Sequence, residues 1–265
     1  MIRKTLRSTI SATFSLDLPS SDIRSVPTPT GTGFFISPDG YFLTAAHVVC
    51  KDGKPRNDIQ NGRLSKESRI GIPPHACQFI EPVFVDQRTD IAVLKVDFEQ
   101  NRPKDWLKDR DDFPYVSVSS RVLELGEPVY SFGYPLSSSE VKRNDGVMTV
   151  VVNQLGPRVT SAIVSSDIDK TAHIMRSSDP QNYVLDKALN YGNSGGPIIS
   201  SDTGNVHAIC SRFQPVYVPQ AHLRGSGQSD TPSVMIPSLY GVVSSLRNST
   251  FVDMCAELGI AVRDN

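Results

Sequence analysis

The sequence lacks three features that would place it in other classes of protein. Its formal net charge is only −1 over 265 residues, which gives no electrostatic reason to expect binding of nucleic acid or an anionic membrane. It has no apolar run near the roughly 20 residues that a membrane-spanning helix requires. Helical periods are also missing between its strand-like runs, so a parallel α/β sheet is disfavoured.

Cysteine is scarce as well. There are four, Cys50, Cys77, Cys210 and Cys255, and neither they nor the histidines show metal-ligand spacing. We expect reduced, mostly buried thiols, with Cys50–Cys77 ranking first should a bridge form. The basic segment 1–7 is not followed by the compact apolar stretch of a signal peptide, which favours a cytoplasmic protein. The sequence leaves open whether the chain is part of a longer one.

Short runs of β-branched and aromatic residues recur between Gly, Pro, Asn and Asp. They predict strands at 33–36, 41–44, 79–85, 91–96, 129–132, 147–152, 183–185, 197–200 and 206–210. Many short strands are typical of a barrel or a sandwich. Segments 51–74 and 99–112 are polar and predict loops.

The end of the sequence predicts helices. A short one opens at Pro237-Ser238, and Thr250 with Asp253 forms a weak capping box for another. The second helix ends at Gly259 and places four apolar residues on one face, namely Phe251, Met254, Cys255 and Leu258.

Three motifs carry the chemistry. Thr44–Val49 contains His47, Thr89–Leu94 contains Asp90, and Gly192–Pro197 contains Ser194. A serine hydroxyl is a poor nucleophile at neutral pH, and it needs an imidazole base, a carboxylate that orients the base, and N–H donors for the oxyanion. Asp90 is preferred to its rivals Asp86 and Asp97, because an apolar strand follows it at once.

The serine motif also satisfies the G-x-S-x-G pattern of α/β-hydrolases. That elbow requires a helix directly after its serine. Here residues 196–199 read Gly-Pro-Ile-Ile, which is hostile to a helix and strand-like. The elbow interpretation also lacks a well-placed histidine near the C-terminus, so it is the weaker one.

The order His, Asp, Ser resembles that of trypsin-like serine proteases, and more closely their HtrA/Deg-like branch without a PDZ domain. The flanking segments 31–44, 125–135, 186–190 and 235–237 share this resemblance. It implies an all-β, chymotrypsin-like fold of two antiparallel six-stranded β-barrels with short C-terminal helices. The first barrel, 1–118, would carry His47 and Asp90, the second, 119–245, would carry Ser194, and 246–265 would be a helix packed on the barrels.

The resemblance also implies roles for further residues. The oxyanion hole would be formed at Gly192, Asn193 and Ser194, and the primary specificity site at Ala188 and Leu189. Substrate backbone would pair with Ser211, Arg212 and Phe213.

Two of these positions bear on activation and specificity. Digestive trypsins have Asp where this chain has Asn193, so we expect no activation by a new N-terminus. Because Ala188 offers no carboxylate, a small or medium apolar residue is expected before the cut, although nearby Asp186 keeps a basic residue open. Arg212 would favour an acidic side chain further upstream.

The motifs therefore predict a serine endopeptidase that works through an acyl-enzyme, without metal or organic cofactor, in limited or regulatory proteolysis. The expected partners are a protein or peptide substrate and a regulatory protein, with no nucleic acid and no membrane. The alternative is a latent module with a protease fold that stays inactive until a partner remodels its loops. The sequence predicts no oligomeric state.

Overall fold

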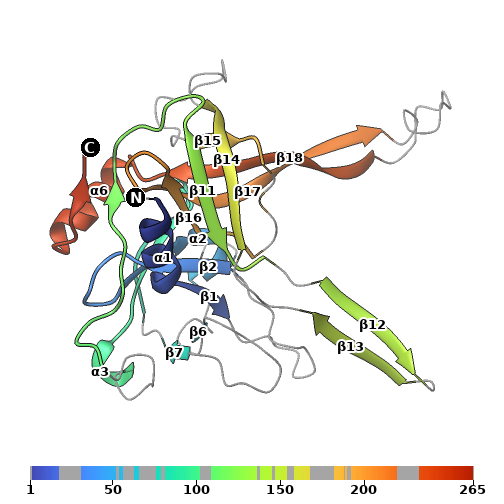
Figure 1. Cartoon of the computed structure of the whole chain (residues 1–265), viewed down its shortest axis with the longest axis horizontal. Coiled ribbons are helices and arrows are strands. Elements are labelled where there is room, and N and C mark those ends of the chain that lie inside the picture. The colour runs from blue at the N-terminus through green and yellow to red at the C-terminus, as the bar shows by residue number, and fades with distance from the viewer. Residues whose placement is uncertain are drawn as a thin grey trace.

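A computed structural model of the chain describes residues 2–17, 31–51, 54–55, 63–65, 76–78, 81–101, 109–135, 138–144, 147–153, 158–167, 182–187, 189, 192–219 and 233–264. Two sheets dominate these residues, and few helices accompany them (Figure 1). Their strands come from separate halves of the chain, so each of the three motifs can be assigned to one sheet.

The first sheet has the strand order β7-β6-β1-β2-β3-β9-β8, and all its pairings are antiparallel. Its strands are β1 (Thr13–Asp17), β2 (Gly31–Phe35), β3 (Tyr41–Ala45), β6 (Arg63–Ser65), β7 (Ala76–Gln78), β8 (Glu81–Asp86) and β9 (Ile91–Lys95). Two short strands and two helical turns accompany it, namely β4 (Cys50–Lys51), β5 (Lys54–Pro55), α2 (Ala46–Val49) and α3 (Phe98–Asn101).

The second sheet has the order β16-β11-β14-β15-β18-β17-β10-β19. An additional pairing between β16 and β17 closes six of these strands into a barrel. The strands are β10 (Val118–Ser119), β11 (Pro128–Gly133), β14 (Arg158–Asp167), β15 (Asn182–Leu185), β16 (Pro197–Ser200), β17 (Val206–Pro219), β18 (Ser233–Ser245) and β19 (Val262–Arg263). A separate hairpin is formed by β12 (Ser138–Asn144) and β13 (Val147–Asn153).

This architecture confirms the expected all-β, chymotrypsin-like class. Each of the nine predicted strands corresponds to a strand of the structure. In the described residues the first sheet has seven strands, since the short β6 and β7 extend it beyond β1. The barrel boundary at 118 stays a prediction.

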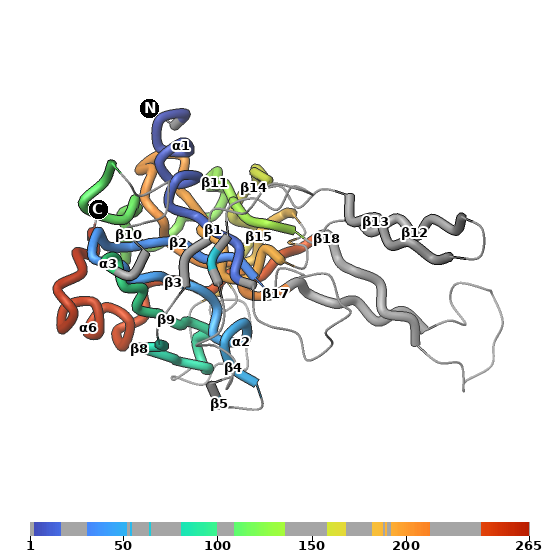
Figure 2. Tube along the Cα trace, turned by 90° about the horizontal axis from the view of Figure 1, so that it is seen from below, coloured from blue at the N-terminus to red at the C-terminus, as the bar shows by residue number. Residues whose placement is uncertain are grey.

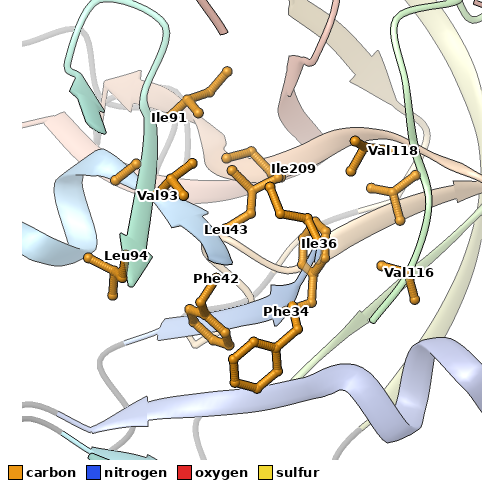
Figure 3. Packing of buried hydrophobic residues seen from close by; sticks show 14 of the residues in the cluster. Phe34, Ile36, Phe42, Leu43, Ile91, Val93, Leu94, Val116, Val118 and Ile209 are labelled. Carbon is orange, nitrogen blue, oxygen red and sulfur yellow. The ribbon is translucent and has the colours of Figure 1, made fainter. Parts of the chain in front are cut away.

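The two sheets share one hydrophobic core. Phe34, Phe42, Leu43 and Val93 of the first sheet lie in the same buried cluster as Ile209 of β17 (Figure 3). Ile199 and Val206 of the second sheet belong to this cluster too, whereas a second cluster fills the closed barrel. The shared core fixes how the two sheets lie against each other.

Two helices, α1 (Ile2–Ala12) and α6 (Ser249–Glu257), pack on the outside of the sheets and lie apart in Figure 2. The predicted C-terminal helix is α6 (Ser249–Glu257), and Phe251, Met254 and Cys255 are buried as expected. Its cap differs from the prediction, because the Asn248 side chain accepts a hydrogen bond from the Thr250 N–H at 3.0 Å. None of the described helices is long and apolar enough to cross a membrane.

Local structure also differs from the sequence prediction at Pro237 and near the N-terminus. The helix predicted at Pro237-Ser238 is wrong, because both residues lie within β18 and Pro237 is paired with Pro215 of β17. The N-terminal helix α1 (Ile2–Ala12) was not predicted. It packs through Leu6 and Ala12 against the shared core.

Candidate active site

His47 and Asp90 lie side by side because β3 and β9 pair. Ala45 is opposite Ile91 in that ladder, and His47 follows in the single turn of α2. The Asp90 carboxylate lies 2.8 and 3.0 Å from His47 Nδ1 and accepts the His47 backbone N–H at 2.9 Å. A proton on Nδ1 satisfies this carboxylate and leaves the lone pair on Nε2 available as a base.

Asp90 adopts a left-handed backbone conformation, with φ at 59°. Aspartate and asparagine are among the few residues other than glycine that adopt it readily. The conformation turns the chain into β9 while the Asp90 carbonyl accepts the Ala46 N–H at 3.0 Å. The side chain of His47 is 49% exposed and that of Asp90 only 16%, so the imidazole is accessible above a largely covered carboxylate.

Ser211 brings a second donor to Asp90 from the other sheet. Its hydroxyl lies 2.5 Å from Asp90 Oδ2. The register between β17 and β18 shifts between Cys210 and Arg212, so Ser211 sits in a bulge. Bulges next to active sites redirect a side chain, and this one directs the Ser211 hydroxyl across the boundary between the sheets. The sequence predicts only substrate pairing for Ser211, and its contact with Asp90 is found in the structure alone.

The loop around Ser194 requires its glycines. Gly192 and Gly195 have φ of 91° and 82°, a region that side chains disfavour. A Cβ on residue 195 would lie 2.3 Å from both the Thr32 carbonyl oxygen and the Thr44 hydroxyl oxygen. Because the Thr44 hydroxyl donates to the Thr32 carbonyl at 2.7 Å, a Cβ there would disturb this bond, and Gly195 allows the serine loop to approach the first sheet.

Thr32 of β2 holds that loop in place. Its N–H donates to the Ser194 carbonyl at 2.7 Å, and its hydroxyl donates to the Gly192 carbonyl at 2.6 Å. The same hydroxyl accepts the Tyr134 N–H at 3.0 Å. Sequence analysis missed Thr32. The available signal was a threonine in an apolar strand, whose buried hydroxyl must find a partner.

The Ser194 hydroxyl is half-buried, and its acceptor among the described residues is the Ser211 carbonyl, at 3.5 Å. The structure therefore joins His47, Asp90 and Ser211 by hydrogen bonds, and Ser194 joins this set through the Ser211 backbone. In proteases without substrate the bond between nucleophile and base is often long and forms on binding.

The rival carboxylate Asp86 has a structural role. It accepts the Thr89 hydroxyl at 2.8 Å and the Arg88 N–H at 2.9 Å. Burial alone would raise the pKa of Asp86, but these hydrogen bonds outweigh it and the pKa is lowered. Asp86 thus stabilises the turn that precedes Asp90.

The residues expected at the primary specificity site differ in what the structure shows of them. Ala188 lies outside the described residues. Leu189 is buried and packs so closely on Gly241 that a Cβ there would lie 2.5 Å from Leu189 Cγ. The Asp186 carboxylate, which had left basic specificity open, accepts the Ile163 N–H of β14 at 2.8 Å.

The remaining expected contacts lie on β17 and in the serine loop. Arg212 is exposed, and Phe213 is opposite Gly241 in the ladder. Gly192 and Asn193 are buried, and the Gly192 carbonyl points to Thr32. Their assignment to an oxyanion hole stays a prediction.

Cys50, Cys210 and Cys255 are free thiols, so the Cys50–Cys77 bridge is not formed. Burial raises the pKa of Cys210 and of Cys255 to about 12. Burial also raises the pKa of Cys50, and the nearby Asp90 charge adds to this effect. Among the residues that the structure describes, no group of three or more His, Cys, Asp or Glu side chains is arranged to hold a metal ion.

The chain matches the trypsin-like peptidase domain family over residues 31–209 and belongs to it. Among its relatives is a probable periplasmic serine endoprotease DegP-like of Rhizobium meliloti (strain 1021), 31% identical over 199 residues, which are 74% of this chain and 31% of the relative. Another is the serine protease HTRA1 of Xenopus tropicalis, 31% identical over 180 residues, which are 68% of this chain and 30% of the relative. The chain therefore spans about a third of the length of these curated relatives.

A solved structure shares the fold. The serine endoprotease from Yersinia pestis superposes with a TM-score of 0.55 at 20% identity, covering 98% of this chain and 66% of the other. The family match and the relatives confirm the HtrA-like, trypsin-like assignment made from the sequence motifs, and the superposition confirms the fold.

Proposed function

We propose that the chain is a serine endopeptidase in which Ser194 is the nucleophile, His47 the general base and Asp90 its orienting carboxylate. One observation carries the proposal. The Asp90 carboxylate accepts hydrogen bonds from His47 of its own sheet and from Ser211 of the other, and Ser211 also contacts Ser194. The polar groups that serine chemistry needs thus form one chain across the boundary between the sheets.

In the proposed reaction, Ser194 Oγ attacks the substrate carbonyl carbon and its proton passes to His47 Nε2. Asp90 stabilises the imidazolium that forms, and its bond from Ser211 keeps the carboxylate oriented. The backbone N–H groups of Gly192 and Ser194 would hold the oxyanion, each contributing about 10²–10³ in rate. The imidazolium then protonates the leaving amine, and an acyl-enzyme on Ser194 remains until water, activated by His47, hydrolyses it.

A fluorophosphonate probe tests this assignment, because it reacts covalently with an activated serine. We expect labelling of the wild-type chain, none of Ser194→Ala, and strongly slowed labelling of His47→Ala. A Ser201→Ala variant, which removes a half-buried serine of the same barrel, is the matched control and should label like the wild type. Undiminished labelling of Ser194→Ala would refute the role of Ser194.

For the primary specificity site we propose a small or medium apolar residue before the cut. Leu189 supports this, since its buried side chain fills space beside Gly241. Asp186 is already engaged by the β14 backbone, so a buried substrate cation would lack a partner, at a cost of several kcal/mol. A peptide-library cleavage profile with Lys or Arg before the cut would contradict this.

The second candidate is a latent protease-fold module that requires a partner to become active. The contact of the Ser194 hydroxyl with the Ser211 carbonyl favours it, because that hydroxyl must turn toward His47 before it can react. Regulatory cleavage of a partner protein fits either state. Labelling that occurs only after addition of a peptide or protein would support latency, and labelling of the purified chain alone would exclude it.

We also propose a cytoplasmic location. The free, buried thiols of Cys210 and Cys255 support a reducing compartment. Some relatives are named periplasmic, which is the competing location. Cell fractionation with a tagged full-length protein decides between the two.

A further inference from the structure

From Ser211 onward, one edge of strand β17 has no partner strand among the described residues. This edge begins beside Ser194, the proposed nucleophile. One side of β17 pairs with β18 as far as Pro219. The other side pairs with β16 only as far as Ile209. Ser211 follows, and its carbonyl contacts Ser194 Oγ at 3.5 Å. An extended peptide can add to such an edge by main-chain hydrogen bonds.

Proline limits the length of this edge. Pro215 and Pro237 are opposite each other in the ladder, and neither has an N–H to give its partner. They must form a non-hydrogen-bonded pair, so the backbone polar groups of Pro215 point away from β18, toward the open edge. Because the direction alternates along a strand, those of Tyr217 and Pro219 point to the same edge. Two of these three outward positions lack a donor, which discourages strand addition. Substrate pairing is therefore confined to residues 211–213.

Register then assigns substrate positions. We number the residue before the cut P1 and those preceding it P2 and P3. With P1 at Ser211, an antiparallel peptide has P2 opposite Arg212 and P3 opposite Phe213. Residues directly opposite each other project to the same face of a sheet. Since Ser211 is buried and Arg212 is exposed, the Arg212 guanidinium lies on the face that P2 will occupy.

Arg212 forms no ion pair with any carboxylate of the described residues. Asp90 is engaged by His47 and Ser211, and Asp186 by the Ile163 N–H. The neighbouring Lys187 is exposed and also positive.

We propose that Arg212 is a specificity-determining residue that selects a Glu or Asp side chain at P2. The inference rests on the proposed function and adds a substrate class to it. A planar guanidinium binds a carboxylate with two parallel hydrogen bonds, which a neutral amide of the same shape cannot match. For an exposed pair this amounts to about three- to fivefold in affinity.

The test measures binding without chemistry. Fluorescent peptides that differ only in Glu, Gln or Lys at P2 are titrated by anisotropy against Ser194→Ala, which cannot cleave them. We expect Glu to bind about three- to fivefold more tightly than Gln, with a smaller ratio at high salt. The ratio should fall to about one in Arg212→Gln, and Arg212→Glu should prefer Lys. A second peptide set with Glu at P3 should show no preference.

Arg263→Gln is the matched control, because it removes an exposed arginine from β19, the last strand of the sheet, which does not pair with β17 directly. It should keep the wild-type ratio. A Glu preference that survives Arg212→Gln, or one that follows P3, would overturn the proposal.

Cleavage assays separate this result from the proposed function. Cleavage by the wild-type chain regardless of P2 charge refutes the role of Arg212 alone. Charge-selective binding without any cleavage or labelling supports Arg212 and refutes the catalytic assignment.

Discussion

Replacing Thr32 by valine tests whether one buried hydroxyl positions the nucleophile. Valine has the same shape and keeps the backbone N–H that donates to the Ser194 carbonyl. It removes the hydroxyl that donates to Gly192 and accepts from Tyr134. All three residues are buried, so water cannot replace the lost hydroxyl.

The expected loss of stability follows from the two groups that Thr32→Val leaves without a partner, the Gly192 carbonyl and the Tyr134 N–H. A buried carbonyl or N–H that loses its hydrogen bond costs about 1–3 kcal/mol, so the pair costs about 2–6 kcal/mol. The added methyl group returns about 0.8 kcal/mol of apolar burial. We therefore expect the free energy of unfolding of Thr32→Val to fall by about 1–5 kcal/mol, a large share of a typical domain's stability.

Activity should fall as well, because the Gly192 carbonyl would no longer be anchored. A displacement of about 1 Å in a catalytic group lowers the rate by about 100-fold. We expect the second-order rate of fluorophosphonate labelling to fall by about 10–100-fold under conditions in which the variant is still folded.

Thr32→Ser is the matched control, since it keeps the hydroxyl and loses one methyl group. It should cost about 1 kcal/mol and leave the labelling rate within about threefold of wild type. Urea unfolding followed by tryptophan fluorescence gives the stability. If Thr32→Val labels as fast as Thr32→Ser, Thr32 is a packing residue and the argument for a clamp fails.

Three further predictions concern other residues. Asp90→Asn should fold normally, because asparagine also tolerates a φ of 59°, yet its peptidase kcat should fall by about 10³–10⁴-fold; a loss under tenfold would contradict the assignment. Gly195→Ala should abolish labelling, whereas Gly126→Ala, also at positive φ but with nothing within 4 Å of its Cβ, should label normally and cost about 1–2 kcal/mol in urea unfolding. Burial lowers the pKa of His207, so the unfolded chain binds more protons as pH falls through 6.5 and stability should decline there. Thermal unfolding between pH 8 and 5 should show a shallower decline for His207→Gln, and an unchanged slope would refute this.

The sequence was informative where structure is local. The strands and the apolar face of α6 depend on residues close in sequence. The pairing of His47 with Asp90, which are 43 residues apart, was expected from the order of the motifs and the resemblance they carry. Asp90 could be chosen over Asp86 because it directly precedes an apolar strand.

Contacts between distant segments could not be predicted in this way. Thr32 donates to a carbonyl 160 residues away, and the Ser211 hydroxyl contacts a carboxylate 121 residues away. No sequence pattern around a threonine or a serine identifies the group with which its hydroxyl will form a hydrogen bond. The helix expected at Pro237 failed for the same reason, since only the opposing strand β17 makes that segment extended.

The same two hydroxyls show why the site depends on how the sheets dock. Thr32 belongs to the first sheet and holds the loop that carries Ser194 of the second. Ser211 belongs to the second sheet and holds Asp90 of the first. Each sheet therefore orients a proposed catalytic group that the other supplies, and a relative shift of the sheets would weaken both contacts together. Because Ile209 lies in the shared core only two positions before Ser211, the packing that docks the sheets also sets the geometry of the proposed proton transfer.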